Sequence, residues 1–300
     1  MNMKKVLILG GSKFIGKAII DVLKDKYQIF VLNRGNNPIP KTFQITADRE
    51  NKLDLLKNYC FDFVIDISGM NRNHLLNTLP YINTKKYLLI SSSAVYDINN
   101  LKAPFKENDE QNINSIWTSY GYDKIEAEKL LIQSKIPYII IRPPYVYGDN
   151  NYVAREGLII NELEKNHPIF IPKSNNKIQF IYVYDLAKII LDLLENSCVN
   201  EIFNVGNDIF TFENWVKKIG EAVNIEPRII KIDDENPRSF FPFYPYDNYL
   251  NTEKIKKICN HHTDFILGIN GYIKSNPSLI IKESLKEKIN SLICLFSSNK

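Results

Sequence analysis

The sequence predicts an α/β protein in which a parallel, doubly wound sheet is followed by a smaller C-terminal lobe. Short apolar runs alternate with amphipathic helical patterns over the first half of the 300 residues, which is typical of successive βαβ units. The runs are apolar throughout, as expected of strands that are covered on both faces. After "RPPYVYGDNN" the alternation loosens, so the second half is expected to leave the sheet and form the lobe.

The elements follow in order from these patterns. Strands are expected at 5–10, 28–33, 61–69, 86–96 and 137–143, and helices at 14–26, 51–59, 73–81 and 120–134. In the second half we expect helices at 157–165 and 184–195, a strand, turn and helix over 201–223, and an ordered aromatic loop at 233–249. A dinucleotide-binding domain is predicted at 1–150 with returning segments near 178–206, a substrate lobe at about 151–275 and a helical tail at 276–300.

The tail carries a stripe of apolar residues at helical spacing, which indicates a packing face. The stripe consists of Ile281, Leu285, Ile289, Leu292 and Phe296.

Composition indicates an ordinary globular protein and excludes several classes. The net charge of +4 is spread along the chain, whereas a nucleic-acid-binding protein usually shows a basic patch. The four cysteines form no CxxC pair and no metal-ligand spacing, so we expect no metal and a reducing, cytoplasmic location. No run is long and apolar enough to span a bilayer, and no signal peptide or membrane partner is expected.

The stretch "LGGSKFIG" between the first strand and the first helix is typical of a dinucleotide-binding turn. Its glycines let the backbone approach a pyrophosphate, and the helix N-terminus supplies N–H groups and partial positive charge. The alternative is a tight turn without a ligand. The predicted cofactor contacts here are Gly10, Gly11, Ser12, Lys13, Phe14, Ile15 and Gly16.

The ends of the next strands add further candidates. NAD sites usually carry a carboxylate after the second strand, but this chain has Asn33 followed by Arg34. Asn33 can bond a ribose hydroxyl without repelling a phosphate, and Arg34 is either a partner for a 2′-phosphate or a solvated surface arginine. Asp48 is expected near the adenine or, alternatively, as a helix N-cap. Ser68 and Gly69 suit a backbone that passes close to a ligand.

The motif "YGYDK" predicts the catalytic pair. Tyr120 and Lys124 are four residues apart and share one helix face. A nearby ammonium lowers a phenol pKa, so the tyrosine can exchange a proton with a carbonyl or alcohol oxygen near neutral pH. A serine in "SSSAVY" upstream could bond the same oxygen.

Taken together and in chain order, these motifs resemble the extended short-chain dehydrogenase/reductase family, the NAD(P)-dependent epimerase/dehydratase group with its Rossmann-like fold. The resemblance covers about residues 3–275 and rests on "GGSKFIG", "NRG", "SSSAVY", "YGYDK", "IIRPPYVYG", "IYVYDLA" and "IFNVG". By position it implies Ser92 as the catalytic serine, with Ser93 as a substitute that contacts substrate. It also implies Tyr120 as the general acid/base and Lys124 as its partner. The backbone from Pro143 to Val146 would hold the nicotinamide carboxamide.

Departures from the family pattern concern the substrate. Dehydratases of the family place Asp-Glu after the catalytic residue, where this chain has Ser93–Ala94, which argues against a dehydratase. A diphosphate-binding arginine is expected seven residues before Asp185, where Ile178 stands. Arg238 matches a second such arginine, with a surface role as the alternative, and Tyr145 is a further substrate candidate.

The resemblance leaves two functions open. The first is a nucleotide-sugar epimerase or 4-ketoreductase that prefers NADP(H) over NAD(H), because Lys13 and Arg34 resemble the basic pair that clamps a 2′-phosphate. The second is a non-catalytic RNA-binding or regulatory protein, since the "GGSKFIG" and "NRG" motifs also resemble the branch of chloroplast stem-loop RNA-binding proteins. The complete Ser92, Tyr120 and Lys124 set disfavours nucleic acid as a partner. The family also implies a homodimer through the 120–134 helix.

Overall fold

The computed structural model describes residues 3–275 and 277–297, which divide into two compact units. Over the described residues, the first unit comprises 3–144, 183–206 and 250–262, and the second comprises 145–182, 207–249, 263–275 and 277–297. Unlike in the predicted division, residues 178–182 and the described part of the tail belong to the second unit, and 250–262 belongs to the first.

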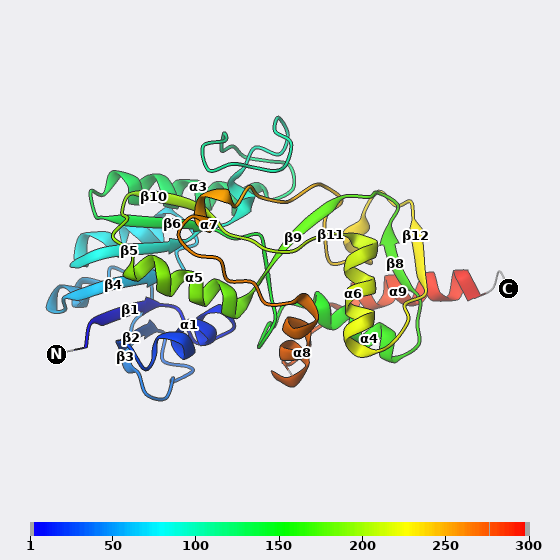
Figure 1. The fold of residues 1–300 in the computed structure, drawn as a ribbon, viewed down its shortest axis with the longest axis horizontal. Coiled ribbons are helices and arrows are strands. Elements are labelled where there is room, and N and C mark those ends of the chain that lie inside the picture. Colours follow the sequence, from blue (N-terminus) through cyan, green and yellow to red (C-terminus); the bar gives the residue numbers. More distant parts are fainter. Residues whose placement is uncertain (1–2, 276, 298–300) are drawn as a thin grey trace. The chain divides into compact units, whose positions relative to one another are not determined.

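The first unit contains a seven-stranded sheet in the order β10-β6-β5-β4-β1-β2-β3 (Figure 1). Every neighbouring pair is parallel, so the predicted Rossmann-like, doubly wound fold is confirmed. The strands are β1 Lys5–Leu9, β2 Gln28–Asn33, β3 Phe43–Thr46, β4 Phe61–Asp66, β5 Thr84–Ile90, β6 Tyr138–Arg142 and β10 Glu201–Asn204.

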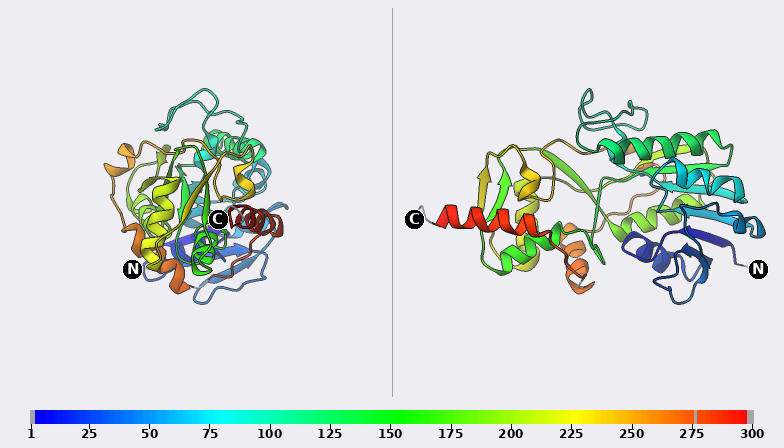
Figure 2. Two further views of the ribbon diagram at one scale, coloured as in Figure 1. Left: turned by 90° about the vertical axis from the view of Figure 1, so that its right-hand side faces the viewer. Right: turned by 180° about the vertical axis from the view of Figure 1, so that it is seen from behind.

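Helices cover both faces of this sheet. α1 (Ile15–Leu23) packs against α5 (Val183–Glu195) on one face, and α2 (Arg72–Leu76) packs against α3 (Thr118–Gln133) on the other (Figures 1 and 2). The short α7 (Glu253–Lys256) lies beside β10. Because helices cover both faces of the sheet, side chains on both faces of a central strand are buried, which explains why the strands are continuous apolar runs in the sequence.

Two predicted helices are shorter than expected. The 51–59 pattern forms only a 3₁₀ turn, Asp54–Asn58, and the 73–81 pattern splits into α2 and a 3₁₀ turn, Leu79–Tyr81. Pro80 explains the split, because a proline disfavours the α conformation in the residue before it and lacks an N–H to continue the helix.

The register places the carboxyl ends of the strands at one edge of the sheet. Leu9 pairs with both Leu32 and Asp66, and Asp66 pairs with Leu89. Ligands of open α/β sheets bind outside these carboxyl ends. The fold therefore brings the segments after β1, β2, β4, β5 and β6 to a common edge.

The second unit is built from two small sheets and four helices in the described residues. Its strands are β7 Tyr145–Tyr147, β8 Ile169–Pro172, β9 Lys177–Tyr182, β11 Ile209–Thr211 and β12 Ile229–Ile232, and its helices are α4 Glu156–Glu164, α6 Phe212–Val223, α8 Phe265–Ser275 and α9 Glu283–Ser297. β9 pairs with β7 and β11, which explains why 178–182 leaves the first unit. An aromatic core fills the unit, with Phe180 stacked on Trp215 at 5.8 Å between ring centroids.

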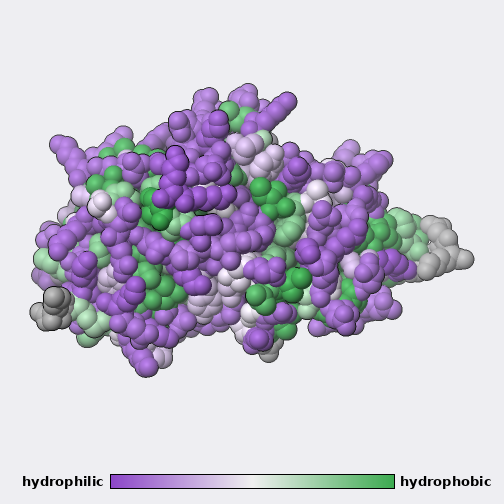
Figure 3. All heavy atoms as spheres, viewed as in Figure 1, coloured by the Kyte–Doolittle hydropathy of each residue, from purple (hydrophilic) through white to green (hydrophobic). Residues whose placement is uncertain are grey.

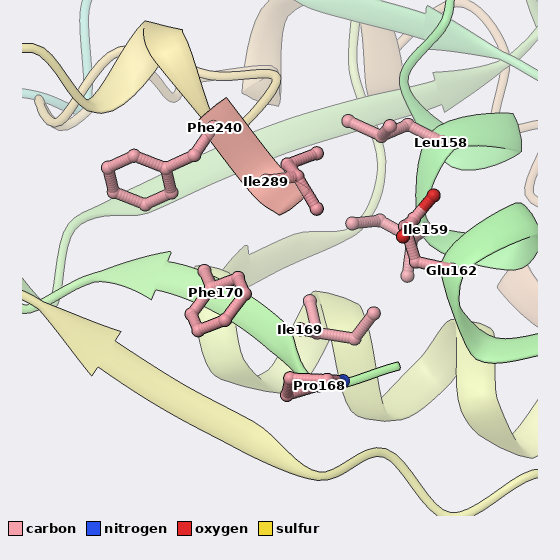
Figure 4. Close-up of a pocket in the computed structure, with 8 residues that line it drawn as sticks. All are labelled: Leu158, Ile159, Glu162, Pro168, Ile169, Phe170, Phe240 and Ile289. Carbon is pink, nitrogen blue, oxygen red and sulfur yellow. The ribbon is translucent and has the colours of Figure 1, made fainter. Parts of the chain in front are cut away.

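The apolar stripe of the tail is a packing face over its described part. Ile289 and Leu292 of α9 are buried, and Ile289 points toward Leu158 of α4 and Phe170 of β8 across a small, almost wholly apolar pocket (Figure 4). Positions 276 and 298–300 of the predicted tail lie outside the described residues. Exposed apolar atoms elsewhere form small, separate patches on the face shown in Figure 3.

Candidate active site

The turn after β1 has the backbone shape of a phosphate cradle. Gly10 and Gly11 have φ angles of +96° and +105°, which L side chains rarely adopt. A Cβ on Gly16 would lie 2.1 Å from the Cα of Gly11, so only glycine lets α1 approach the turn this closely. The N-cap of α1, Phe14, makes no side-chain cap hydrogen bond, and a helix N-terminus of this kind attracts anions.

The remaining predicted turn residues surround this cradle. The side chain of Lys13 is exposed, those of Ser12 and Ile15 are partly exposed, and Phe14 is buried with a φ of +37°. Lys13 thus lies on the outside of the turn, while Phe14 anchors the turn in the core.

The end of β2 holds a buried polar atom with no hydrogen-bond partner. Asn33 Oδ1 accepts hydrogen bonds from the N–H of Gly35 at 2.8 Å and from Gln44 Nε2 at 2.8 Å. Its Nδ2 is buried and has no partner in the structure, although such donors are normally satisfied. This donor and the glycine cradle fit a bound dinucleotide.

Arg34 and Asp48 both lie at the protein surface. The side chain of Arg34 is exposed. Asp48 Oδ1 accepts the N–H of Glu50 at 3.1 Å, and no helix begins there. The alternative of Asp48 as a helix N-cap is therefore wrong.

Ser68 and Gly69 face the cradle from the end of β4. A Cβ on Gly10 would lie 3.3 Å from Ser68 Oγ. A Cβ on Gly69 would lie 2.6 Å from Asp66 Oδ2. The sequence predicts that this backbone passes close to a ligand; in the structure the space beside Gly69 is taken by the carboxylate of Asp66, and the contact with a ligand stays a prediction.

A buried ion pair beneath this segment was missed by the sequence analysis. The guanidinium of Arg49 forms a two-pronged pair with the carboxylate of Asp66 and donates to Ser68 Oγ at 2.9 Å. Tyr87 donates its hydroxyl hydrogen to Asp66 Oδ2 at 2.5 Å. Burial opposes ionisation of Asp66, but Arg49 outweighs it and lowers the pKa of Asp66. The available signal was a carboxylate at the end of an otherwise apolar strand.

The predicted serine lies in a tight turn after β5. Ser92 caps the 3₁₀ turn Ser93–Val95, and its Oγ accepts the N–H of Ala94 at 3.2 Å. Its side chain is partly exposed, whereas that of Ser93 is buried. The Ser93 N–H donates to the carbonyl of Pro143 at 2.9 Å, which joins two of the predicted site segments.

The first turn of helix α3, which includes Tyr120, packs against this turn. A Cβ on Gly121 would lie 2.5 Å from the Ala94 carbonyl oxygen, so the first turn of α3 touches the backbone beside Ser92. Asn114, which the sequence analysis also missed, fixes the contact. Its Nδ2 donates to the Ala94 carbonyl at 3.1 Å, and its Oδ1 accepts the N–H of Trp117 at 2.8 Å.

Lys124 is buried one turn further along α3. Its Nζ donates to the carbonyls of Gly69 at 3.0 Å and Ile90 at 2.9 Å. Burial lowers the pKa of Lys124 to about 8, although Asp66 and Glu128 act in the opposite direction. The structure thus ties α3 to the ends of both β4 and β5.

The remaining predicted residues lie in the second unit. Tyr145 is buried, and its ring contacts Phe243 at 4.6 Å between centroids. Arg238 is exposed and its guanidinium lies over the Tyr244 ring, 5.0 Å from the centroid.

A second arginine of this unit was not predicted. The Arg155 guanidinium lies 4.9 Å from the Tyr145 ring centroid, and its Nη1 donates to the carbonyl of Val146 at 3.3 Å. Ile178, at the position where the family places an arginine, is wholly buried. No sequence motif pointed to Arg155.

Two features are absent from the part of the chain that the structure describes. Within 3–275 and 277–297, no three His, Cys, Asp or Glu side chains are grouped so that they could hold a metal ion. Over the same residues, no helix combines the length and apolar character needed to cross a membrane.

The sequence is similar to known proteins. The sequence model of the NAD dependent epimerase/dehydratase family matches residues 6–206. The chain is 31% identical to the chloroplast stem-loop binding protein of 41 kDa b from Arabidopsis thaliana, over 88% of this chain and 76% of that protein.

Solved structures of low identity share the fold. One is a UDP-N-acetylglucosamine 4-epimerase from Methanobrevibacter ruminantium in complex with UDP-N-acetylmuramic acid, with 20% identity, a TM-score of 0.74 and coverage of 92% of this chain and 98% of that chain. Another is a dTDP-glucose 4,6-dehydratase from Bacillus anthracis in complex with NAD, with 18% identity, a TM-score of 0.74 and coverage of 91% and 96%.

Proposed function

Because the chain belongs to the NAD-dependent epimerase/dehydratase family, we propose that it is an NAD(P)-dependent nucleotide-sugar epimerase or 4-ketoreductase. One observation carries the proposal: a Cβ on Gly121 would lie 2.5 Å from the Ala94 carbonyl oxygen, so the helix that carries Tyr120 and Lys124 packs directly on the turn that begins at Ser92. This assembly stands at the carboxyl edge of the sheet that also carries the glycine cradle.

The residues of the first unit divide the chemical work. A bound nicotinamide supplies the site that accepts and returns a hydride. Ser92 Oγ donates a hydrogen bond to the reacting sugar oxygen, and Tyr120 takes the hydroxyl proton of that oxygen or returns it. The positive charge of Lys124 favours the phenolate form of Tyr120. Gly10, Gly11 and Gly16 admit the pyrophosphate to the backbone.

Dehydration is not part of this proposal. Elimination of water needs an acid beside the catalytic residue to protonate the leaving hydroxyl, and Ser93 and Ala94 supply none. A dehydratase of known structure shares the fold, so Ser93 and Ala94, and not the fold, disfavour dehydration.

We propose NADP(H) as the preferred cofactor, with NAD(H) as the alternative. The exposed side chains of Lys13 and Arg34 provide the positive charge that a 2′-phosphate requires, and Asn33 puts no negative charge against it.

Replacing Arg34 by alanine tests this preference. The affinity for NADPH is expected to fall about tenfold to a hundredfold, the size of a charge-assisted hydrogen bond, with little change for NADH. Both dissociation constants are measured by quenching of protein fluorescence. Lys85→Ala is the control: Lys85 lies at the amino end of β5, away from the carboxyl edge of the sheet, so both dissociation constants should stay unchanged. An equal loss for both cofactors contradicts the phosphate clamp.

Arg155 and Arg238 support a substrate with a diphosphate group. They flank one aromatic cluster of the second unit, in which Tyr145 contacts Phe243 and Tyr244 follows in the chain. Paired guanidinium groups are suited to phosphate oxygens.

Alanine at either arginine is therefore expected to weaken nucleotide-sugar binding about tenfold or more, while NADPH binding is retained. Isothermal titration with UDP and with UDP-sugars measures the loss. Arg228→Ala serves as the control in the same unit. Unchanged UDP affinity in both variants would remove these residues from the substrate site.

Native mass spectrometry of the purified protein is the direct test of the proposed function. A co-purified NAD or NADP together with a nucleotide sugar identifies the cofactor and substrate class at once. Protein that neither carries nor takes up a dinucleotide at millimolar concentration contradicts the proposal.

The relative from Arabidopsis favours a second candidate, a non-catalytic RNA-binding or regulatory protein. The name of that protein refers to stem-loop binding, and its sequence is 31% identical to this chain. A salt titration of stem-loop RNA binding separates the candidates, because a steep fall of affinity with salt indicates many phosphate contacts. Absence of binding at low salt removes this candidate.

We propose that the protein forms a homodimer through α3. Tyr122 and Ile132 project exposed side chains from this helix, and Leu76 does so from the adjacent α2. Because α2 is only a short helix, α3 provides most of the surface. Analytical ultracentrifugation of the wild type and of Ile132→Glu tests the assignment.

A further inference from the structure

The buried pair of Arg49 and Asp66 lies outside every role assigned above. Both side chains are almost fully buried, and their contacts are extensive. Besides Asp66 and Ser68, the guanidinium of Arg49 reaches the His74 carbonyl at 3.3 Å and Thr78 Oγ1 at 3.2 Å. Replacing a buried ion pair by apolar residues often leaves the stability of a protein unchanged or raises it. Stability alone therefore does not account for this pair.

The contacts of Asp66 lead to Lys124 through one residue. The carboxylate of Asp66 packs against the backbone of Gly69, where a Cβ would come within 2.6 Å of Oδ2. The carbonyl of the same Gly69 accepts a hydrogen bond from Lys124 Nζ at 3.0 Å. The placement of the Lys124 ammonium therefore depends on where Asp66 holds the turn after β4, and Arg49 holds Asp66 and Ser68 together.

We propose that Arg49 and Asp66 are positioning residues for Lys124, and that their opposite charges set the field in which its ammonium ionises. The inference rests on the proposed function only in taking Lys124 as the partner of Tyr120. The pair itself can be tested without any enzymatic assay.

The charges that face Lys124 come from three elements. Asp66 follows from β4 and Glu128 from α3 itself, and both raise the pKa of Lys124, whereas Arg49 from the loop after β3 lowers it, along with burial. Glu128 is already neutralised by Arg142, whose Nη2 lies 2.7 Å from its Oε2. Removing the Asp66 charge and removing the Arg49 charge should therefore change the electrostatic field at Lys124 in opposite directions.

The test uses Asp66→Asn and Arg49→Gln, with the Lys124 side chain followed by ¹³C NMR across pH. Asp66→Asn leaves Arg49 uncompensated, so the pKa of Lys124 is expected to fall by about one pH unit or more. Arg49→Gln leaves the Asp66 charge uncompensated, so the pKa of Lys124 is expected to rise. A merely structural pair would give no opposite shifts. Shifts of one sign in both variants, or none, overturn the proposal.

Tyr87→Phe is the matched control, because it removes a neutral hydrogen bond to Asp66 and leaves both charges in place. The pKa of Lys124 should stay close to its wild-type value in this variant. Arg49→Lys should restore most of that value, because it restores the positive charge.

A measurement on the unmodified protein covers the case in which a charge variant does not fold. The ¹³C signal of the Asp66 carboxyl should shift as Lys124 loses its proton near pH 8, because the two groups share Gly69. Absence of any step in that signal at the Lys124 midpoint overturns the proposal.

Activity provides a separate readout. The alkaline limb of the kcat/KM profile should move with the pKa of Lys124 in each variant. If the NMR shifts appear as expected and the activity profile does not follow, the catalytic assignment of Lys124 fails while the role of the pair stands.

Discussion

Replacing Tyr120 by phenylalanine is expected to abolish turnover while leaving cofactor binding nearly intact. The phenol hydroxyl is the proposed proton donor and acceptor, and loss of such a group costs about 10²- to 10⁴-fold in rate. The ring itself remains, including its packing 6.0 Å from the Trp117 ring. Turnover is followed by mass spectrometry of the nucleotide sugar identified in the native protein, and NADPH binding by fluorescence.

Tyr122 is a matched control for this change. It lies two residues further along α3 and its side chain is exposed, so Tyr122→Phe removes the same hydroxyl from the same helix outside the proposed site. Its rate should equal that of the wild type. Undiminished turnover in Tyr120→Phe would refute the catalytic role.

Among the variants proposed here, Arg142→Met is expected to lower the free energy of unfolding the most. Arg142 ends β6 and is buried, with Nε 3.1 Å from Glu128 Oε1 and Nη1 3.0 Å from Tyr96 Oη. Glu128 raises the pKa of Arg142 against the opposing effect of burial, so the guanidinium stays charged. Its removal leaves the buried Glu128 carboxylate with the neutral Gln111 amide but without its opposite charge, which costs about 3–5 kcal/mol of unfolding free energy. Urea unfolding measures the loss.

Two further variants make this result interpretable. Adding Glu128→Gln to Arg142→Met should recover part of the lost stability, because the lone buried charge is removed. Lys129→Met breaks the exposed pair with Glu126 on the same helix and should cost at most about 1 kcal/mol. A loss in Arg142→Met no larger than in Lys129→Met would contradict the prediction.

The sheet and the glycine turn after β1 could be predicted from the sequence because their signals are local. A strand that is buried on both faces needs an apolar run in its own sequence. The close approach of α1 to the turn needs a glycine at position 16. In both cases the residues that show the feature in the sequence are the residues that form it. The spacing of Tyr120 and Lys124 is likewise a property of one helix.

The rest depends on partners far apart in the chain. Arg49 and Asp66 are 17 residues apart in the chain, and no sequence motif predicts that they pair. Asn114 acts through backbone groups of Ala94, which no side-chain pattern reveals. Likewise, 178–182 reads as an apolar strand in either unit, and only its pairing with β7 and β11 decides the assignment.

The contact between Gly121 and the Ala94 carbonyl limits how this protein can change. The spacing between the serine turn and the tyrosine helix is set by main-chain atoms, so side-chain replacements on the outer face of α3 leave it untouched. Under the proposed function, Arg155 and Arg238 of the second unit can therefore be replaced without a change in the spacing between the proposed catalytic residues Ser92 and Tyr120. Any side chain at position 121, even the methyl group of alanine, would clash with the Ala94 carbonyl oxygen and push α3 away from the serine turn.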